Sequence, residues 1–158
     1  DKDAVVASML ICEMAAYYKS QGKTLIDVMN GLYDEFGYYC NTVQSYTFEG
    51  AAGMEKMAAI MDGLRDNKPS SFAGYEVTKI DDYKTSKSTI VKTGEESEIT
   101  LPKSNVLAYT LTNGNKVIVR PSGTEPKIKA YITAIGQSEE NAKEIAQRLL
   151  NDANELMK

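Results

Sequence analysis

The residues best suited to chemistry lie in one run of eight, Arg120-Pro121-Ser122-Gly123-Thr124-Glu125-Pro126-Lys127. The Arg120 guanidinium carries paired donors that match two oxygens of a phosphate group. Ser122 and Thr124 add hydroxyl donors, and Gly123 permits a tight turn whose backbone amides converge on an anion. The two prolines restrict the run in advance, so less entropy is lost on binding. The pattern predicts a phosphate-binding loop, and the alternative is a proline-stiffened hairpin with surface charges.

The charges around this run are mixed. Glu125 is unfavourable for anion binding unless its carboxylate turns outward or pairs with a lysine. Lys127 and Lys129 could add positive charge. Alternation along the following strand predicts that Lys129 lies on the face away from the apolar residues.

The composition excludes several other functions. The 158 residues include no histidine, so the usual general base at neutral pH is missing and a self-contained hydrolase is not expected. Cys12 and Cys40 form no CxxC motif, which favours two reduced thiols in a cytoplasmic protein over a zinc or redox site. The net charge of −4 argues against a nucleic-acid partner. No apolar run reaches the ~20 residues that span a bilayer, so no membrane partner is expected either.

Two weaker patterns favour structural roles. Gly50-x-x-Gly53 precedes a helical pattern but lacks the third glycine and the lysine of a phosphate-binding motif, so a simple turn is favoured. The acids Glu95, Glu96 and Glu98 have no fixed spacing or partner, which favours a solvated face over a metal site.

The elements around the run predict an α+β fold. Alternating apolar residues predict strands that begin at Val106, Lys116 and Ile128, with Asn113-Gly114 as a turn at positive φ. Over the rest of the chain, helices are predicted at 4–19, 24–36, 54–67 and after Ser138, and strands at 39–48 and 74–82. The polar span 84–104 is long for a structureless connection, so we expect a mobile part or a short extra strand there. The order predicts a mainly antiparallel sheet with helices on one face.

A resemblance to a known family covers nearly the whole chain. The run Arg120–Lys127, followed by Ile128-Lys129-Ala130-Tyr131, resembles the C-terminal phosphate-binding signature of the α-D-phosphohexomutases, the phosphoglucomutase/phosphomannomutase family. Lys2-Asp3-Ala4-Val5, the two N-terminal helices and Gly50-x-x-Gly53-Met54 also resemble the end of the third domain and the start of the fourth. The likeness is weakest over 84–104.

The resemblance implies a four-domain enzyme of which this chain is a C-terminal fragment. Residues 1–37 would be the helical tail of the third, sugar-binding domain. Residues 38–158 would form the fourth, phosphate-binding domain, with a TATA-box-binding-protein-like α+β sheet. In the family, a phosphoserine of the first domain donates the phosphoryl group and carboxylates of the second hold Mg²⁺. No catalytic residue and no metal ligand is therefore expected in this chain, and the fragment alone should be inactive.

The resemblance also implies a reaction, the reversible interconversion of hexose 1-phosphate and 6-phosphate through a glucose 1,6-bisphosphate-type intermediate in the cytoplasm. By position, the side chains or backbone of Arg120, Ser122, Gly123, Thr124 and Lys129 would bind the substrate phosphate. The expected partners are the sugar phosphate and the remaining domains of the enzyme.

Two alternatives stay open. Within the family, the enzyme could be a phosphoglucosamine mutase or a phosphopentomutase. Outside it, the chain could be a stand-alone anion-binding or protein-interaction module, with the apolar helices over 4–36 as its docking surface.

Overall fold

Two compact units make up the protein, with their boundary between Tyr38 and Tyr39. The computed structural model describes residues 2–50 and 52–157. The boundary lies one residue from the one expected at 37/38. The assignment of the first unit to a third domain stays a prediction.

The first unit contains two helices, α1 (Ala4–Ser20) and α2 (Leu25–Phe36). The Asp3 carboxylate caps α1 by accepting a hydrogen bond from the Val6 N–H at 2.9 Å. Thr24 and Asp27 form the capping box that begins α2. Both predicted helices are confirmed. Neither contains a buried residue, and both expose large apolar side chains, namely Val5, Val6, Met9, Leu10, Ile11, Met14 and Tyr17 of α1 and Ile26, Met29, Leu32 and Phe36 of α2.

The second unit is built on one sheet, in which the described residues form eight strands in the order β1-β8-β7-β6-β3-β4-β5, with β2 paired to β3. The strands are β1 (Tyr38–Thr47), β2 (Ser71–Phe72), β3 (Tyr75–Asp82), β4 (Lys87–Ile90), β5 (Glu96–Glu98), β6 (Leu107–Leu111), β7 (Lys116–Pro121) and β8 (Lys127–Gly136). Each pair of neighbouring strands among β2 to β8 is antiparallel.

Strand β1 also runs antiparallel to its neighbour β8. The Thr133 hydroxyl donates to the Asn41 side-chain oxygen at 2.8 Å, and the Phe48 N–H donates to the Pro126 carbonyl at 2.9 Å. As the residue number rises from 41 in β1 to 48 just after it, the number of the partner residue in or next to β8 falls from 133 to 126, as it does in an antiparallel pair. The predicted α+β class with a mainly antiparallel sheet is confirmed.

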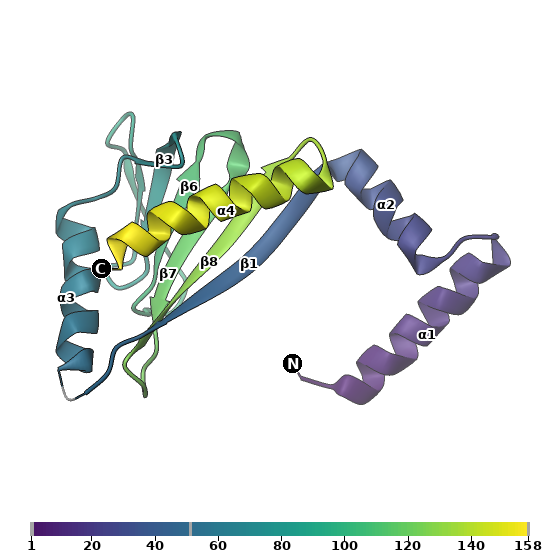
Figure 1. The fold of residues 1–158 in the computed structure, drawn as a ribbon, viewed down its shortest axis with the longest axis horizontal. Coiled ribbons are helices and arrows are strands. Elements are labelled where there is room, and N and C mark those ends of the chain that lie inside the picture. The colour runs from purple at the N-terminus through teal and green to yellow at the C-terminus, as the bar shows by residue number, and fades with distance from the viewer. Residues whose placement is uncertain (1, 51, 158) are drawn as a thin grey trace. The chain divides into compact units, whose positions relative to one another are not determined.

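Helices α3 (Gly53–Asp66) and α4 (Glu139–Leu156) pack on one face of this sheet, and α4 lies across β6, β7 and β8 (Figure 1). The core joins alternate strand residues to the apolar side of each helix, and it includes Met57, Met61, Leu64, Val77, Leu107, Tyr109, Val117, Val119, Ile128, Ile132, Ile145 and Leu149. The intervening residues of β7 and β8 point to the other face, which these helices leave open.

The span 84–104 differs most from the prediction, because it holds two strands rather than a single short one. Strands β4 and β5 form a hairpin that extends the sheet from β3. Apart from Ile90, the side chains of its two strands are polar, as in the Lys87–Glu96 ion pair at 2.7 Å. Backbone pairing and not an apolar alternation therefore holds the hairpin. The strand β2 was also not predicted. At the β6–β7 turn, Asn113 and Gly114 have the predicted positive φ of 63° and 85°.

An ion pair ties α3 to the sheet. Arg65 donates to both carboxylate oxygens of Asp82, at 3.1 and 3.3 Å, and the two side chains are only 14% and 16% exposed. Burial raises the pKa of Asp82, but hydrogen bonds from Arg65 and the Lys84 backbone, with the Arg65 charge, outweigh burial and hold it below its ordinary value of 3.8.

This ion pair should make part of the stability depend on pH. Because the pKa of Asp82 is lowered by folding, its contribution is present above pH 3.8 and is lost as the pH falls through the lower folded value. We expect Asp82→Asn to lower the free energy of unfolding at pH 7 by about 2 kcal/mol. The difference from the wild type should shrink below about pH 4. Urea denaturation across pH measures this.

The matched control is Asp66→Asn, which alters an exposed acid at the end of the same helix. It should change stability by no more than about 0.5 kcal/mol. An Asp82→Asn deficit that stays constant from pH 7 to pH 2 would contradict the assignment.

Candidate functional site

The loop singled out by the sequence joins β7 to β8 and is shorter than the eight-residue run. Strand β7 extends through Pro121 and β8 begins at Lys127, so five residues, 122–126, make the connection. The Ser122 N–H donates to the Lys127 carbonyl at 2.7 Å and closes the hairpin. Arg120 therefore lies within the sheet ladder and not in the five-residue turn. Strand pairing restricts where its guanidinium can point.

Two cations face each other across the strands beside this loop. Arg120 of β7 is directly opposite Lys129 of β8. Both side chains are exposed, and because Val119 and Ala130 are fully buried under the helices, the two cations lie on the open face. Lys129 is thus on the predicted face. Within residues 2–50 and 52–157, no acidic side chain pairs with either cation. Like charges in opposite positions repel, so an anion near both would be stabilising.

The loop amides converge on the hydroxyl oxygen of Ser122. This oxygen accepts the Thr124 N–H at 3.4 Å and the Glu125 N–H at 3.3 Å. Both distances exceed the usual 2.7–3.2 Å for such bonds, so both bonds are weak. A charged acceptor could replace Ser122 Oγ at closer range. The amides of Thr124 and Glu125 are therefore the available donors, whereas the Ser122 amide is used across the hairpin.

The backbone conformation of Gly123 does not explain why the loop has a glycine there. Its φ lies outside the left-handed region, so the turn itself does not require glycine. A Cβ built on Gly123 would meet no atom within 4 Å. The absent side chain instead leaves open space beside the backbone, where another group could approach closely.

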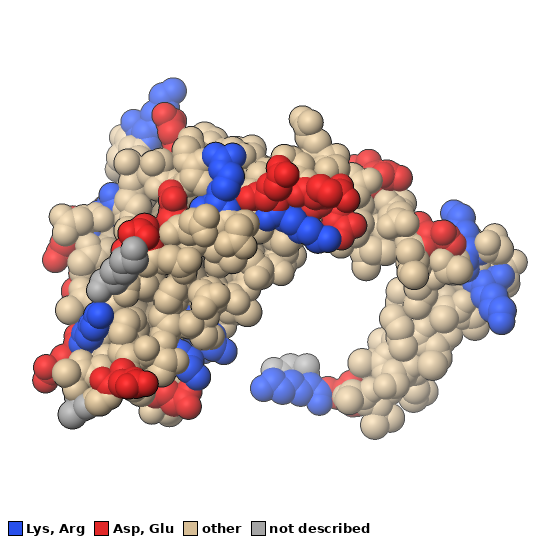
Figure 2. All heavy atoms as spheres, in the orientation of Figure 1, with Lys and Arg blue, Asp and Glu red and all other residues tan. Residues whose placement is uncertain are grey.

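The negative charge of the loop is compensated. Glu125 pairs with Lys127, whose ammonium lies 3.3 Å from the carboxylate. Because Glu125 pairs with a lysine, its carboxylate need not prevent the loop from binding an anion. Elsewhere, acidic side chains gather along α4, on the helix-covered side of the sheet (Figure 2), and Glu139 and Glu140 lie in its first turn. An acidic protein can therefore still present a local cationic face.

Metal ligands do not gather in the described part of the chain. No group of three or more cysteine, aspartate or glutamate side chains comes together there in a way that could hold a metal ion. The helices described in residues 2–50 and 52–157 also lack the length and apolar character needed to cross a bilayer. The chemistry available at the loop is anion binding by cations, hydroxyls and backbone amides.

The far end of the loop is held by a contact that no local pattern predicted. The Pro126 carbonyl accepts the Phe48 N–H, so the loop lies at the end of the sheet where β1 ends and α3 begins (Figure 1). Phe48 and Pro126 are distant in sequence, so this hydrogen bond could have been predicted only from the pairing of β1 with β8.

The chain resembles phosphoglucomutases at three levels. Residues 55–152 match the family described as phosphoglucomutase/phosphomannomutase, C-terminal domain. The phosphoglucomutase of Staphylococcus haemolyticus is 36% identical over 151 residues, which cover 96% of this chain and 27% of that protein. The phosphoglucomutase of Staphylococcus aureus (strain bovine RF122) is 41% identical over 133 residues, which cover 84% of this chain and 24% of that protein.

A solved structure shares the fold. The open form of the Paramecium phosphoprotein pp63/parafusin, titled a phosphoglucomutase, matches with a TM-score of 0.60 at 17% identity. The match covers 99% of this chain and 27% of that one. This chain thus spans about a quarter of the length of its curated relatives.

Removal of the Ser122 hydroxyl should loosen the loop without unfolding the protein. In Ser122→Ala, the Thr124 and Glu125 amides lose their acceptor. Because both bonds are weak, their hydrogen exchange should accelerate by about two- to threefold. Thr124→Val is the control, because it removes a hydroxyl from the same loop that these amides do not use. Amide hydrogen exchange measured by NMR tests this prediction. Equal exchange rates of the two amides in Ser122→Ala and in the wild type would contradict the role of Ser122 Oγ as their acceptor.

Proposed function

Because the chain belongs to the phosphoglucomutase/phosphomannomutase family, we propose that it is the C-terminal part of a phosphoglucomutase. Its role there is to bind the phosphate of a hexose phosphate while the enzyme interconverts the 1-phosphate and the 6-phosphate. The two Staphylococcus relatives named above are phosphoglucomutases, which supports glucose as the sugar. Mutases of phosphoglucosamine or phosphopentose are the alternatives within this proposal.

The observation that carries the proposal is the unneutralised pair of Arg120 and Lys129 beside a loop with an open backbone. These cations lie opposite each other on the open face. In the loop that follows β7, Gly123 leaves open space beside the backbone. A phosphate group offers a double negative charge and several acceptor oxygens to such a site. Each charge-assisted hydrogen bond contributes about 1.5–3 kcal/mol, so three or four would bind a sugar phosphate usefully.

The bound state follows from the weak bonds inside the loop. A phosphate oxygen replaces Ser122 Oγ as acceptor for the Thr124 and Glu125 amides, which now bind at 3.4 and 3.3 Å. The freed Ser122 hydroxyl then turns to donate to the phosphate, and Arg120 supplies a paired contact from the strand. The proline-limited loop reorganises little, which keeps the entropy cost low.

This mode of binding suits the proposed reaction. The intermediate carries a phosphate at both ends and must reorient between two transfers, so the site has to accept either phosphate. Cations, hydroxyls and amides bind the phosphate group and do not read the sugar. Holding the non-reacting phosphate also provides binding energy that positions the reacting one.

The remaining machinery is proposed to lie in other parts of the enzyme. On the family resemblance, a phosphoserine donates the phosphoryl group, and Mg²⁺ bound by carboxylates outside this chain stabilises the charge that develops during transfer. The whole protein is proposed to act in the cytoplasm.

The apolar helices α1 and α2 do not require a separate module to explain them. The likeness to the Staphylococcus haemolyticus enzyme covers 96% of this chain and so includes most of the helical unit. We propose that these helices bury their exposed apolar side chains against the preceding part of the enzyme. A stand-alone interaction module is then unnecessary.

Arg120→Ala should weaken phosphate binding selectively. In a titration of the 158-residue chain with inorganic phosphate, followed by amide NMR, residues 120–129 should shift, and Arg120→Ala should raise the dissociation constant by about tenfold or more. The matched control is Lys116→Ala, which removes a cation from the same exposed face of β7 beyond the loop. Shifts confined to residues 4–36 would instead favour the interaction module.

The complete enzyme should also require Arg120 for its mutase activity. In the enzyme that contains this chain, Arg120→Ala should raise KM and lower kcat/KM for glucose 1-phosphate by about 100-fold. Near-native kinetics would contradict the proposed site.

The isolated chain should show no mutase activity in the same assay, because the proposed phosphoryl donor and metal ligands lie elsewhere. Turnover above background would refute that division of roles.

A further inference from the structure

Gly53, the first residue of α3, lies against the base of the loop. A Cβ built on Gly53 would lie 2.6 Å from the Phe48 carbonyl oxygen and 3.1 Å from the Phe48 carbonyl carbon. It would also lie 3.0 Å from the Cβ of Pro126. Real Cβ atoms do not approach backbone so closely, and neither a backbone carbonyl nor a proline ring can swing aside. Any side chain at position 53 must therefore displace β1, the loop or α3.

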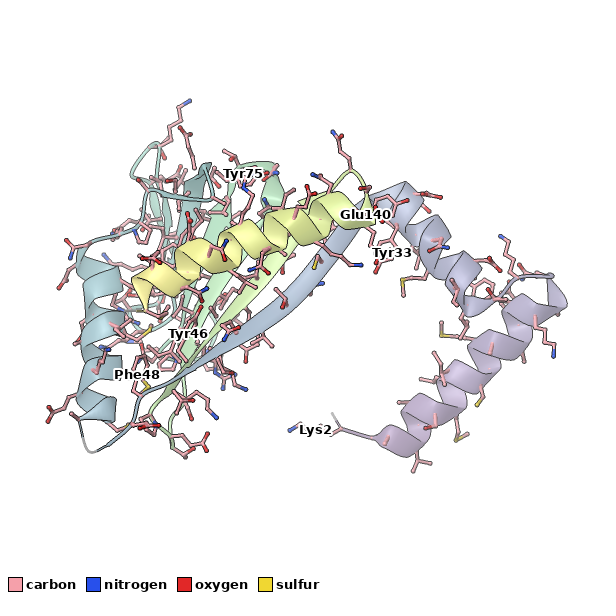
Figure 3. All side chains as sticks on the ribbon, in the orientation of Figure 1. Lys2, Tyr33, Tyr46, Phe48, Tyr75 and Glu140 are labelled. Atoms are coloured by element: carbon pink, nitrogen blue, oxygen red, sulfur yellow. The ribbon has the colours of Figure 1, made fainter. Side chains whose placement is uncertain are left out.

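Phe48 links this close approach to the loop. Its N–H donates to the Pro126 carbonyl at 2.9 Å, while its own carbonyl is the atom nearest Gly53. Its ring lies beside α3, near the end of β1 (Figure 3), and the Lys56 ammonium lies 5.4 Å from the ring centroid. The end of β1, the first turn of α3 and the end of the loop thus meet at one point.

Glycine is required at this position by space and not by conformation. The φ of Gly53 lies outside the left-handed region, so alanine could adopt the same backbone. Gly63, ten residues along in the same helix, offers the contrast, because a Cβ there would meet no atom within 4 Å. Of these two helical glycines, only Gly53 is needed for close packing.

The loop is anchored at both ends, and the second anchor depends on Gly53. The Ser122 N–H holds the first end to Lys127, and the Phe48 N–H holds Pro126 at the second. Between them lie Gly123, Thr124 and Glu125, which contain the amides available to an anion. A shift of Pro126 would turn these amides away from a common point.

We propose that Gly53 is a positioning residue for phosphate binding. By letting α3 lie against Phe48, it fixes Pro126 and with it the direction of the Thr124 and Glu125 amides. The inference rests on the proposed function of the loop, and it gives the turn Gly50-x-x-Gly53 a role in the site without any contact to the ligand.

The test compares Gly53→Ala with Gly63→Ala in the 158-residue chain, titrated with inorganic phosphate and followed by amide NMR. Gly53→Ala should raise the dissociation constant by about tenfold, because a small misplacement of binding groups is costly. Gly63→Ala should bind as the wild type does. The titration reports only on folded molecules, so a purely structural role for Gly53 would lower the melting temperature and leave the affinity unchanged. That result would overturn the inference.

A titration of the wild type keeps the inference testable if Gly53→Ala does not fold. Coupling between the ligand and this contact is reciprocal. The Phe48 and Gly53 amides should therefore shift with the same midpoint as Gly123, while the Gly63 amide stays unchanged. Shifts at Gly123 without any at Phe48 and Gly53 would overturn the positioning role alone. A wild-type chain that shows no saturable shift over residues 120–129 would overturn both the proposed function and this inference.

Discussion

The antiparallel pairing of β7 with β8 is the interaction on which the rest of the structure depends. Because side chains alternate along paired strands, it places Val119 and Ala130 in the core and Arg120 and Lys129 on the open face. The same apolar residues that hold α4 to the sheet thereby aim the two cations away from it. A slip of one residue in the register would bury the charges and expose the core. The register that allows the sheet to fold therefore also fixes the positions of the two cations.

The separation of charge follows from this two-sided sheet. The acids of α4 lie on the helix-covered side, and Arg120 and Lys129 lie on the other. A net charge of −4 therefore does not describe the surface that meets a ligand. The electrostatic potential at the binding surface, and not the total charge, decides which ligand binds. The sheet, which has a low dielectric constant, separates the acidic surface from the cationic one. An acidic protein can therefore carry the proposed phosphate site.

The loop itself is held in place by distant parts of the chain. Its prolines limit the backbone, but the contact between Phe48 and Pro126 decides where the turn ends. Since α3 can approach Phe48 only at a glycine, the packing of a helix outside the loop affects where the loop lies. Preorganisation of this kind distributes the requirements of a binding site over segments that look purely structural.

Local patterns in the sequence were enough to predict the helices, most strands of the core and the turn at Asn113-Gly114. The loop chemistry of Arg120 to Lys127 stays a prediction. Short-range forces determine these features, since apolar spacing, capping and turn preference act within a few residues. Tertiary structure alone decided the rest. The polar β4–β5 hairpin is held by backbone bonds, which no side-chain pattern reports. Likewise, the space that excludes a side chain at Gly53 is created only when β1, α3 and the loop meet.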